Sequence, residues 1–243
     1  MRLLVVGGAG YVASLVVPLL APRHDIHIFD RQPPADARSA HTVAQVTDHQ
    51  ALCVALREID AVIFLAMGDK RFELVEAAHS NLEVAVVGLH LVLDAMHRSG
   101  VPHLVYASTM SVYGGDLLAR RFGDESLPPD SDHVYGLAKR LGEAVCQSAV
   151  RRWGLSVNAL RLCFPLDDAA WQREAVATDG PILATAASDL ARLLEAALRH
   201  RDGFQAFTTS GDYAERIMVM SKARQQLGWA PLARPGGTDA GAV

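Results

Sequence analysis

The chain has few of the features that mark nucleic-acid-binding, membrane-spanning or disulfide-stabilised proteins. Its 23 Lys and Arg against 27 Asp and Glu give a formal net charge of −4, so no overall positive potential attracts nucleic acid or an anionic membrane. No uninterrupted apolar run reaches the ~20 residues that a membrane span needs. The 3 cysteines, Cys53, Cys146 and Cys163, show no metal-ligand spacing. We therefore expect a cytoplasmic protein with reduced thiols and without a metal, nucleic-acid or membrane partner.

The first residues share one feature with a secretory signal. Met1 and Arg2 precede an apolar stretch, but Gly7, Gly8 and Gly10 interrupt it where the apolar part of a signal is continuous. We expect this segment to form the first strand, turn and helix of the fold instead.

Strand-like and helix-like patterns alternate along the chain. Of its 243 residues, 50% are hydrophobic, enough to bury a substantial core in one domain. The alternation favours a parallel sheet built from βαβ units, a Rossmann-like, doubly wound α/β fold. We expect strands at 3–6, 26–30, 42–46, 61–65, 103–107, 156–161 and 204–208, and helices at 10–20, 71–99 in two pieces, 131–153, 188–200 with Ser188 as N-cap, and 221–227.

A glycine-rich turn between the first strand and the first helix is typical of a dinucleotide site. Gly7 permits a tight turn, Gly10 lets a pyrophosphate approach the backbone, and Ala13 is small enough for the helix to pack on the sheet. Asp30, at the end of the second strand, suits the adenosine ribose hydroxyls and repels a 2′-phosphate, which favours NAD over NADP. The other expected cofactor contacts are Tyr11, Val12, Arg31, which partly offsets the charge of Asp30, Val46, Leu65, Ala66 and Met67.

A tyrosine and a lysine one helical turn apart indicate acid–base chemistry. Tyr135 and Lys139 lie at i and i+4, on one face of the predicted helix. A nearby ammonium stabilises a phenolate and lowers its pKa, and the lysine is also expected to hold the nicotinamide ribose. Tyr135 then takes a hydroxyl proton while hydride leaves the substrate carbon for NAD. Thr109, just after the fifth strand, is expected to hydrogen-bond the substrate oxygen and orient it.

These motifs together resemble a known family. The glycine-rich turn, the segment from Ser108 to Gly114, and the pair Tyr135 and Lys139 are similar to those of the extended short-chain dehydrogenases, the NAD-dependent epimerase/dehydratase group. The resemblance covers nearly the whole chain. It implies that Thr109 assists the catalytic tyrosine. It also implies a homodimer formed through a four-helix bundle, with helices at about 85–99 and 131–153.

The sequence departs from the family pattern in ways that concern the substrate. Phe164 stands where nucleotide-sugar enzymes usually carry an asparagine, and Ala85 stands where the family has a structural asparagine. Met110 and Ser111 replace the Asp-Glu pair of the sugar 4,6-dehydratases, so that elimination chemistry is not expected. The stretch after Phe164 is short, which favours a small or non-nucleotide substrate. The expected substrate contacts are Ser108, Thr109, Ser111, Phe164 and Arg173.

The same observations predict the domain organisation. We expect an NAD-binding Rossmann-like domain at 1–163, a small, reduced C-terminal substrate-capping region at 164–234, and a flexible tail at 235–243. Residues 164–180 are expected to be loop or short helix.

The expected function is reversible hydride transfer between NAD and a hydroxyl-bearing carbon of a sugar or sugar-derived small molecule. Whether the enzyme is an epimerase or a net dehydrogenase stays open. One alternative is a compact uronate-type dehydrogenase, in which Arg173 receives the carboxylate. Another is a regulator that binds NAD without turnover, although such proteins usually lose the tyrosine or the lysine.

Overall fold

A computed structural model describes residues 1–36 and 39–236. A seven-stranded sheet with the order β3-β2-β1-β4-β5-β6-β9 forms its centre, and every neighbouring pair is parallel. The strands are β1 (Arg2–Val6), β2 (Asp25–Asp30), β3 (Ala40–Val43), β4 (Ala61–Phe64), β5 (His103–Thr109), β6 (Ser156–Leu162) and β9 (Phe204–Thr208). The Rossmann-like, doubly wound fold expected from the sequence is confirmed.

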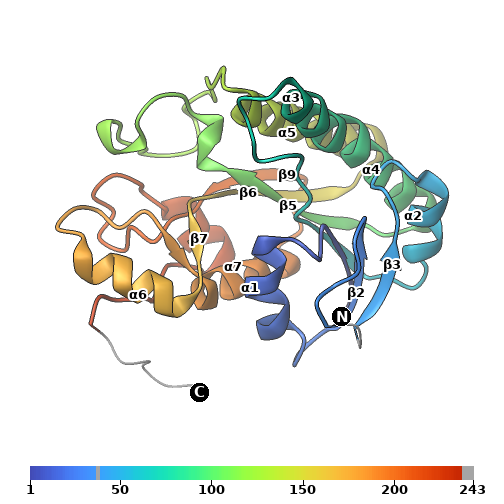
Figure 1. Cartoon of the computed structure of the whole chain (residues 1–243), viewed down its shortest axis with the longest axis horizontal. Coiled ribbons are helices and arrows are strands. Elements are labelled where there is room, and N and C mark those ends of the chain that lie inside the picture. The colour runs from blue at the N-terminus through green and yellow to red at the C-terminus, as the bar shows by residue number, and fades with distance from the viewer. Residues whose placement is uncertain (37–38, 237–243) are drawn as a thin grey trace.

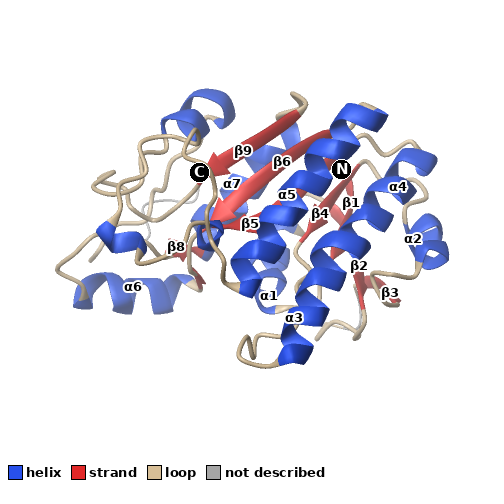
Figure 2. Cartoon of the chain, turned by 90° about the horizontal axis from the view of Figure 1, so that it is seen from above, coloured by secondary structure: helices blue, strands red, loops and turns tan. Residues whose placement is uncertain are grey.

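Helices cover both faces of the sheet, as Figures 1 and 2 show. One face carries α1 (Tyr11–Leu20), α7 (Ala187–Arg199) and the short η4 (Ala223–Leu227). The other carries α2 (His49–Ala55), α4 (Leu89–Ser99) and α5 (Val134–Trp153). Alternate residues of β1 divide between the two cores, since Leu3 and Val5 pack on the first face and Leu4 and Val6 on the second.

A continuous helical stretch leads into α4. It begins with α3 (Val75–Leu82), passes through a π-helical segment, η1 (Glu83–Gly88), and ends in α4, where Gly100 adopts a left-handed conformation. The sequence predicted this stretch from residue 71 and in two pieces. The four residues before Val75 lie outside the helix, and the π-helical segment joins the parts without a break.

Several predicted boundaries are corrected. The third strand runs from Ala40 to Val43 and not over 42–46, and α2 was not predicted at all. Helix α7 begins at Ala187 with Ala186 as its N-cap, so Ser188 lies inside the helix. Residues 164–180 contain β7 (Pro165–Leu166), which pairs with β8 (Thr185–Ala186), and the ten-residue helix α6 (Asp168–Ala177).

The predicted domain boundary after residue 163 does not follow the sheet. Helix α7 covers one face of the sheet, and β9 extends the sheet beyond β6. Both elements therefore belong to the Rossmann-like domain, although they follow residue 163. Two small apolar clusters do lie outside the two cores of that domain. One joins Phe122 to Met218 of the C-terminal part, two residues that also form a parallel β-bridge, and the other surrounds Trp171.

The N-terminal and C-terminal predictions have different outcomes. The segment after Met1 forms β1, with Leu3 to Val6 buried. The predicted tail at 235–243 is described only through residue 236, so the remaining positions lie outside the described residues. Across 1–36 and 39–236, no helix combines the length and the apolar character that a membrane crossing requires.

Candidate active site

The site lies at the carboxyl ends of β1, β4 and β5. The chain order reverses direction across the sheet at β1 and β4, and ligands of open α/β sheets bind at such a point, beyond the carboxyl ends of the strands. The glycine-rich turn follows β1, Met67 follows β4, and Thr109 ends β5. The sheet topology therefore gathers segments that are about 100 residues apart in the sequence.

The glycine-rich turn has the geometry of a phosphate-binding turn. Gly7 has φ +83, its N–H donates to Phe29 O at 2.8 Å, and a Cβ there would overlap the backbone of Ala66. Gly10 is the N-cap of α1, and a Cβ on it would meet Gly7 O at 3.2 Å. No side chain caps α1, and its first turn has no acidic residue. The oriented N–H groups of this helix end suit a phosphate.

Asp30 lies at the end of β2, next to the same turn. Its carboxylate accepts hydrogen bonds from the backbone N–H of Ala9 at 3.0 Å and of Gln32 at 3.1 Å. Both bonds fix the carboxylate beside the first helix, where the adenosine ribose of a dinucleotide lies in this fold. Arg31 follows it and is exposed.

A cavity of about 310 Å³ lies beside the turn and contains nine of the predicted site residues. These nine are Val12, Leu65, Met67, Ser108, Thr109, Ser111, Tyr135, Lys139 and Phe164. The other lining residues are Phe72, Ala107, Met110, Leu117, Leu162, Cys163 and Pro165.

The predicted catalytic residues line this cavity together. Burial raises the pKa of Tyr135, and a hydrogen bond with Thr109 works in the opposite direction. Lys139 is buried, its Nζ donates to Ala107 O at 2.7 Å, and its burial lowers its pKa to about 8. We expected the Lys139 ammonium to lower the pKa of Tyr135. Desolvation of the phenol is instead the larger effect, because the ammonium is directed to a backbone carbonyl.

Thr109 ends β5 and its hydroxyl organises the following turn. Its Oγ1 accepts a hydrogen bond from the backbone N–H of Ser111 at 3.1 Å and donates to Ser111 Oγ at 3.2 Å. The Thr109 hydroxyl is thus fixed between Ser111 and the face of the cavity that carries Tyr135.

Ser108 is turned toward the protein interior. Its Oγ donates to Glu143 Oε1 at 2.6 Å, and Glu143 is paired with Arg161 behind the site. Arg161 also donates to the hydroxyl of Tyr113 at 2.6 Å. The sequence suggested Ser108 as a substrate contact and did not identify Glu143. Glu143 lies one turn beyond Lys139, so helical spacing places it on the same helix face, but this spacing does not indicate its partners Ser108 and Arg161.

Phe72 is a cavity residue that sequence reasoning missed. Its ring centroid lies 5.2 Å from that of Tyr135, and it belongs to the segment before α3. The sequence predicted a helix from residue 71, but Phe72 precedes α3, so the predicted helical pattern did not indicate that Phe72 reaches the site.

The remaining predicted contacts lie outside the cavity lining. Tyr11 begins α1, and its hydroxyl donates to Pro165 O at 3.2 Å, so it bridges the glycine-rich turn and β7. Ala66 lies against Gly7, and Val46 packs on the apolar cluster under α2 and α4. Arg173 is on the exposed side of α6. Arg173 is not among the residues that line the cavity with Tyr135.

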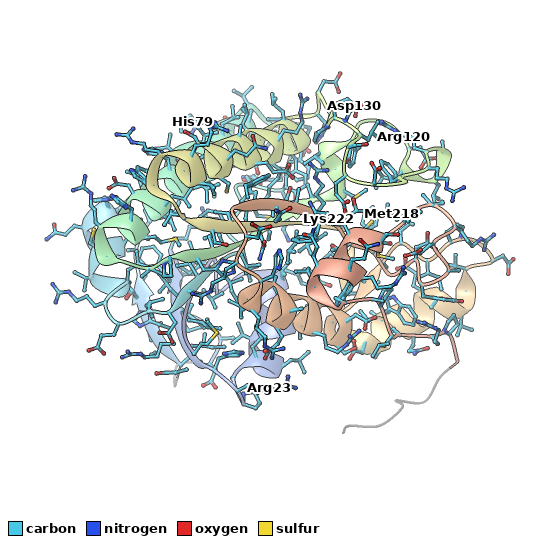
Figure 3. The ribbon with its side chains drawn as sticks, turned by 180° about the vertical axis from the view of Figure 1, so that it is seen from behind. Arg23, His79, Arg120, Asp130, Met218 and Lys222 are labelled. Carbon is cyan, nitrogen blue, oxygen red and sulfur yellow. The ribbon has the colours of Figure 1, made fainter. Side chains whose placement is uncertain are left out.

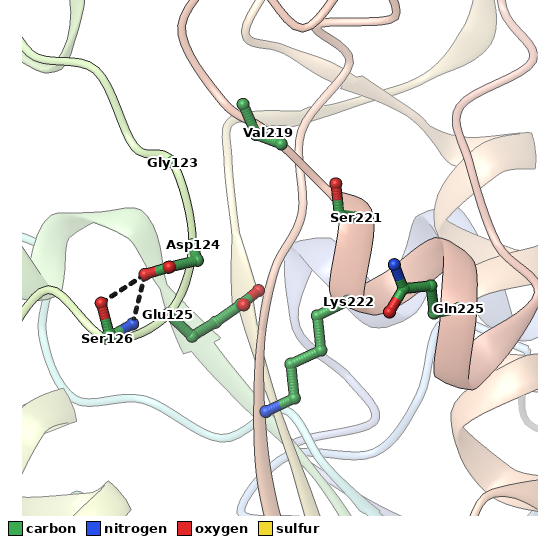
Figure 4. A pocket seen from close by; sticks show the side chains of 8 residues that line it. All are labelled: Gly123, Asp124, Glu125, Ser126, Val219, Ser221, Lys222 and Gln225. Carbon is green, nitrogen blue, oxygen red and sulfur yellow. Dashed lines mark hydrogen bonds between the residues drawn. The ribbon is translucent and has the colours of Figure 1, made fainter.

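A second, larger cavity of about 470 Å³ lies elsewhere, between residues 123–126 and 219–225. Figure 4 shows its lining, in which Asp124 accepts hydrogen bonds from the Ser126 N–H and hydroxyl. Lys222 donates to Ala206 O at 2.9 Å. Lys222 and Met218 lie below Arg120 and Asp130 in Figure 3. This cavity contains none of the predicted site residues.

Within the described part of the chain, no group of three or more His, Cys, Asp or Glu side chains could hold a metal ion. All three cysteines are free. The side chains in the cavity lining that can exchange a proton or a hydrogen bond include Tyr135, Lys139, Thr109 and Ser111.

Comparisons with known proteins agree with this architecture. Residues 3–166 match the model of the NAD dependent epimerase/dehydratase family. The chain is 31% identical over 170 residues to a UDP-glucose 4-epimerase of Corynebacterium glutamicum, covering 66% of this chain and 50% of the relative. It is 30% identical over 173 residues to an L-arabinose 1-dehydrogenase (NAD(P)(+)) of Haloferax volcanii, covering 66% of each.

The solved structures share the fold. A mutated uronate dehydrogenase superposes with a TM-score of 0.76 at 21% identity, over 98% of this chain and 88% of that one. The chain spans about half the length of the first curated relatives that it matches.

Proposed function

Because this chain belongs to the NAD dependent epimerase/dehydratase family, we propose that it is an NAD-dependent oxidoreductase acting at a hydroxyl-bearing carbon. One observation carries the proposal: Tyr135, Lys139 and Thr109, from α5 and β5, line a single cavity beside the glycine-rich turn.

The residues around the turn fit a dinucleotide. The uncapped end of α1 offers N–H groups to a diphosphate, and a Cβ on Gly10 would narrow the space above Gly7 O. Asp30 is available to two ribose hydroxyls, while Val12, Leu65 and Met67 form an apolar wall where the cavity begins. When bound, NAD would supply the acceptor for the hydride that an alcohol carbon loses on oxidation to a carbonyl.

Tyr135 moves the proton in this proposal. In the reduction direction the phenol donates its proton to the carbonyl oxygen, and the raised pKa of Tyr135 keeps that proton in place at neutral pH. In the oxidation direction Tyr135 first loses its own proton to solvent, and the phenolate then receives the hydroxyl proton, so this direction is favoured by alkaline pH. Thr109 orients the substrate oxygen toward the phenol, and Lys139 carries a positive charge near the phenolate below about pH 8.

The carboxylate of Asp30 supports a preference for NAD over NADP. A 2′-phosphate would meet a negative charge that the Ala9 and Gln32 N–H groups fix in place. Exposed Arg31 reduces this repulsion without removing the carboxylate from the ribose position.

A sugar or sugar-derived substrate is supported by the relatives, whose names include a UDP-glucose 4-epimerase and an L-arabinose 1-dehydrogenase. The uronate alternative is supported by the similar fold of a solved uronate dehydrogenase structure. Arg173, whose carboxylate contact that alternative depends on, is not among the residues that line the cavity. A regulator without turnover has no need of a buried lysine beside the tyrosine, and here both line one cavity.

We also propose a homodimer in which α4 and α5 form a four-helix bundle with their copies. Val87, just before α4, and Leu141, on α5, are apolar and exposed, which suits such a contact. Sedimentation of wild type against a Leu141→Glu variant tests it, and equal masses for both at the monomer value reject it. The cytoplasmic location stays a prediction.

Incubation of the protein with NAD and a panel of free sugars, sugar acids and nucleotide sugars tests the proposed function. NADH absorbance indicates a net dehydrogenase, and isomer formation without it indicates an epimerase. Wild type that binds NAD but turns over none of the panel, as Tyr135→Phe does, would favour the regulator.

A further inference from the structure

The cavity lining contains one charged side chain, and that side chain already has a hydrogen-bond partner in the protein. Lys139 is the one charged residue among those that line the cavity. Its ammonium donates to Ala107 O and lies 5.0 Å from the ring centroid of Tyr106, and the residue is 4% exposed. The ammonium is therefore bound to the backbone of β5 and is not directed to a substrate anion.

The other cations around the site are not among the residues that line the cavity. Arg161 is bound by Glu143 and Tyr113 behind the site, and Arg120 donates to Gly114 O and to Asp130. Lys70 lies 5.5 Å from the ring centroid of Tyr11, beside the glycine-rich turn. A carboxylate or phosphate on the reacting part of a substrate would thus leave water and meet no cationic side chain in the cavity lining except Lys139, whose ammonium is bound to Ala107 O, which is unfavourable.

Most of the cavity lining is aromatic or aliphatic. Phe72 comes from the segment before α3 and Phe164 from the segment after β6, and both line the cavity. Phe164 is 62% exposed although it lies at the site, so a large apolar face is left for a ligand to cover. Leu117 and Met110 extend the apolar lining between them. Aromatic faces of this kind bind the C–H face of a ring.

The backbone at Phe164 is in an unfavourable conformation. Its φ is +37, in the left-handed region that disfavours bulky side chains, while asparagine tolerates it well. Strain of this kind persists where the surroundings hold the residue, and it often lies at ligand sites. Replacing Phe164 with Asn therefore removes the aromatic ring and relieves the backbone strain. A loss of substrate binding in this variant would thus not come from a loss of folding stability.

We propose that the reacting part of the substrate is an uncharged ring with an apolar face, which packs on Phe164 and Phe72, and that anionic rings are rejected. This specificity rests on the proposed hydride transfer. An alicyclic alcohol and a neutral sugar, whose C–H groups form one apolar ring face, both have this chemistry, and the arms of the experiment separate them.

Turnover is measured with NAD and two matched pairs: cyclohexanol against 3-hydroxycyclohexanecarboxylate, and D-galactose against D-galacturonate. In the pair whose neutral member turns over faster, we expect kcat/KM to be at least ~10-fold higher for the neutral ring than for the acid. This factor corresponds to the cost of burying a charge without a partner. The pair with the higher neutral rate identifies the source as alicyclic or sugar. Equal or faster turnover of the acids overturns the inference and leaves the proposed function standing.

The variant Phe164→Asn tests the aromatic face. We expect kcat/KM for the neutral ring to fall ~5- to 10-fold, as loss of an aromatic contact predicts, with NAD affinity and melting temperature no lower than wild type. Phe164→Leu, which keeps an apolar side chain, is the matched control and should lose less. An unchanged kcat/KM in Phe164→Asn overturns the inference.

Binding is measured separately from turnover by saturation-transfer NMR on the NADH-loaded protein, in which an alcohol cannot react. We expect saturation of the cyclohexanol ring protons in wild type and in Tyr135→Phe, weaker saturation in Phe164→Asn, and little for the carboxylate. Absence of saturation and of turnover for both neutral rings overturns the inference. Failure to bind NADH overturns the proposed function itself.

Discussion

Glu143 and Arg161 form a buried ion pair directly behind the candidate catalytic residues. Glu143 Oε1 accepts from Arg161 Nε at 3.0 Å and Oε2 from Nη2 at 2.8 Å, and each side chain is 5% exposed. The same carboxylate accepts the Ser108 hydroxyl, so α5, β5 and β6 meet at one group. The pair positions the strand end that carries Thr109 against the helix that carries Tyr135.

Removing one partner should therefore destabilise the protein. Glu143→Gln leaves the Arg161 guanidinium buried without its counter-charge, and we expect the free energy of unfolding to fall by about 3–5 kcal/mol. Glu58→Gln is the control, because Glu58 and Arg2 form an ion pair with side chains 78% and 49% exposed. The control should cost about 0–1 kcal/mol in urea unfolding. A similar small cost in both variants would remove the structural role assigned to Glu143.

The two glycines of the turn should respond differently to alanine. Gly7→Ala places a Cβ against the Ala66 backbone at a positive φ, and should destabilise the fold by about 1–3 kcal/mol or more. Gly10 has an ordinary φ of −82 and a looser contact, so Gly10→Ala should fold normally. Its Kd for NAD should rise by at least about tenfold, because the Cβ enters the space of the diphosphate. Equal NAD affinity in folded Gly10→Ala and wild type would contradict the cofactor placement.

Asp30 should control the choice of dinucleotide. Asp30→Ser removes the charge that opposes a 2′-phosphate and leaves Arg31 beside it, so the ratio of kcat/KM for NADP over NAD should rise by at least about tenfold. Asp25→Ser is the control, because Asp25 begins the same strand at the opposite end of the sheet and should leave the ratio unchanged. Steady-state kinetics with both cofactors measure the effect. A ratio that moves equally in both variants would count against a ribose contact at Asp30.

Lys139 should lower stability at neutral pH. Burial lowers its pKa from 10.5 to about 8, so below pH 8 the folded state holds a charge that the unfolded chain hydrates better. That difference corresponds to about 3 kcal/mol, and loss of the bond to Ala107 O offsets about 1–2 kcal/mol. Lys139→Met should thus be more stable than wild type at pH 7 by about 1–2 kcal/mol, while losing activity.

The stability difference between Lys139→Met and wild type should depend on pH. As pH rises from 8 toward 10.5, wild-type Lys139 is already neutral when folded, so the advantage of Lys139→Met should shrink. Exposed Lys70→Met should show no such trend in denaturant unfolding between pH 7 and 10. A Lys139→Met variant that is less stable at pH 7, with a gap independent of pH, would contradict the burial argument.

The sheet was predictable because its signals are local. Fully buried strands such as β4 and β5 are near-continuous apolar runs, and the glycine-rich turn and Asp30 follow two of the strands directly. Edge strand β3 has no buried residue, so no apolar pattern fixed its position and the prediction was displaced by two residues. Helix α2 is short, with only Leu52 and Ala55 buried, and its pattern was too weak to recognise.

Site residues that belong to sequence motifs were predictable, and those that tertiary packing brings to the site were not. Tyr135 and Lys139 lie four residues apart, so helix geometry alone brings them together. Phe72 and Glu143 reach their partners through tertiary contacts, and no local pattern links Ser108 to a glutamate 35 residues later. The direction of Lys139 toward Ala107 O follows from burial beneath β5, which the spacing could not indicate.

In the proposed reaction Tyr135 transfers the proton, and the other residues of the site bind and orient the substrate and the cofactor. The most direct test is the rate of NADH formation in Tyr135→Phe, with NAD and the best neutral alcohol, beside the control Tyr213→Phe on the exposed surface. We predict that kcat falls by ~10²- to 10⁴-fold in Tyr135→Phe, with NAD affinity and melting temperature unchanged, and stays at the wild-type value in the control. Wild-type kcat in Tyr135→Phe would contradict the assignment.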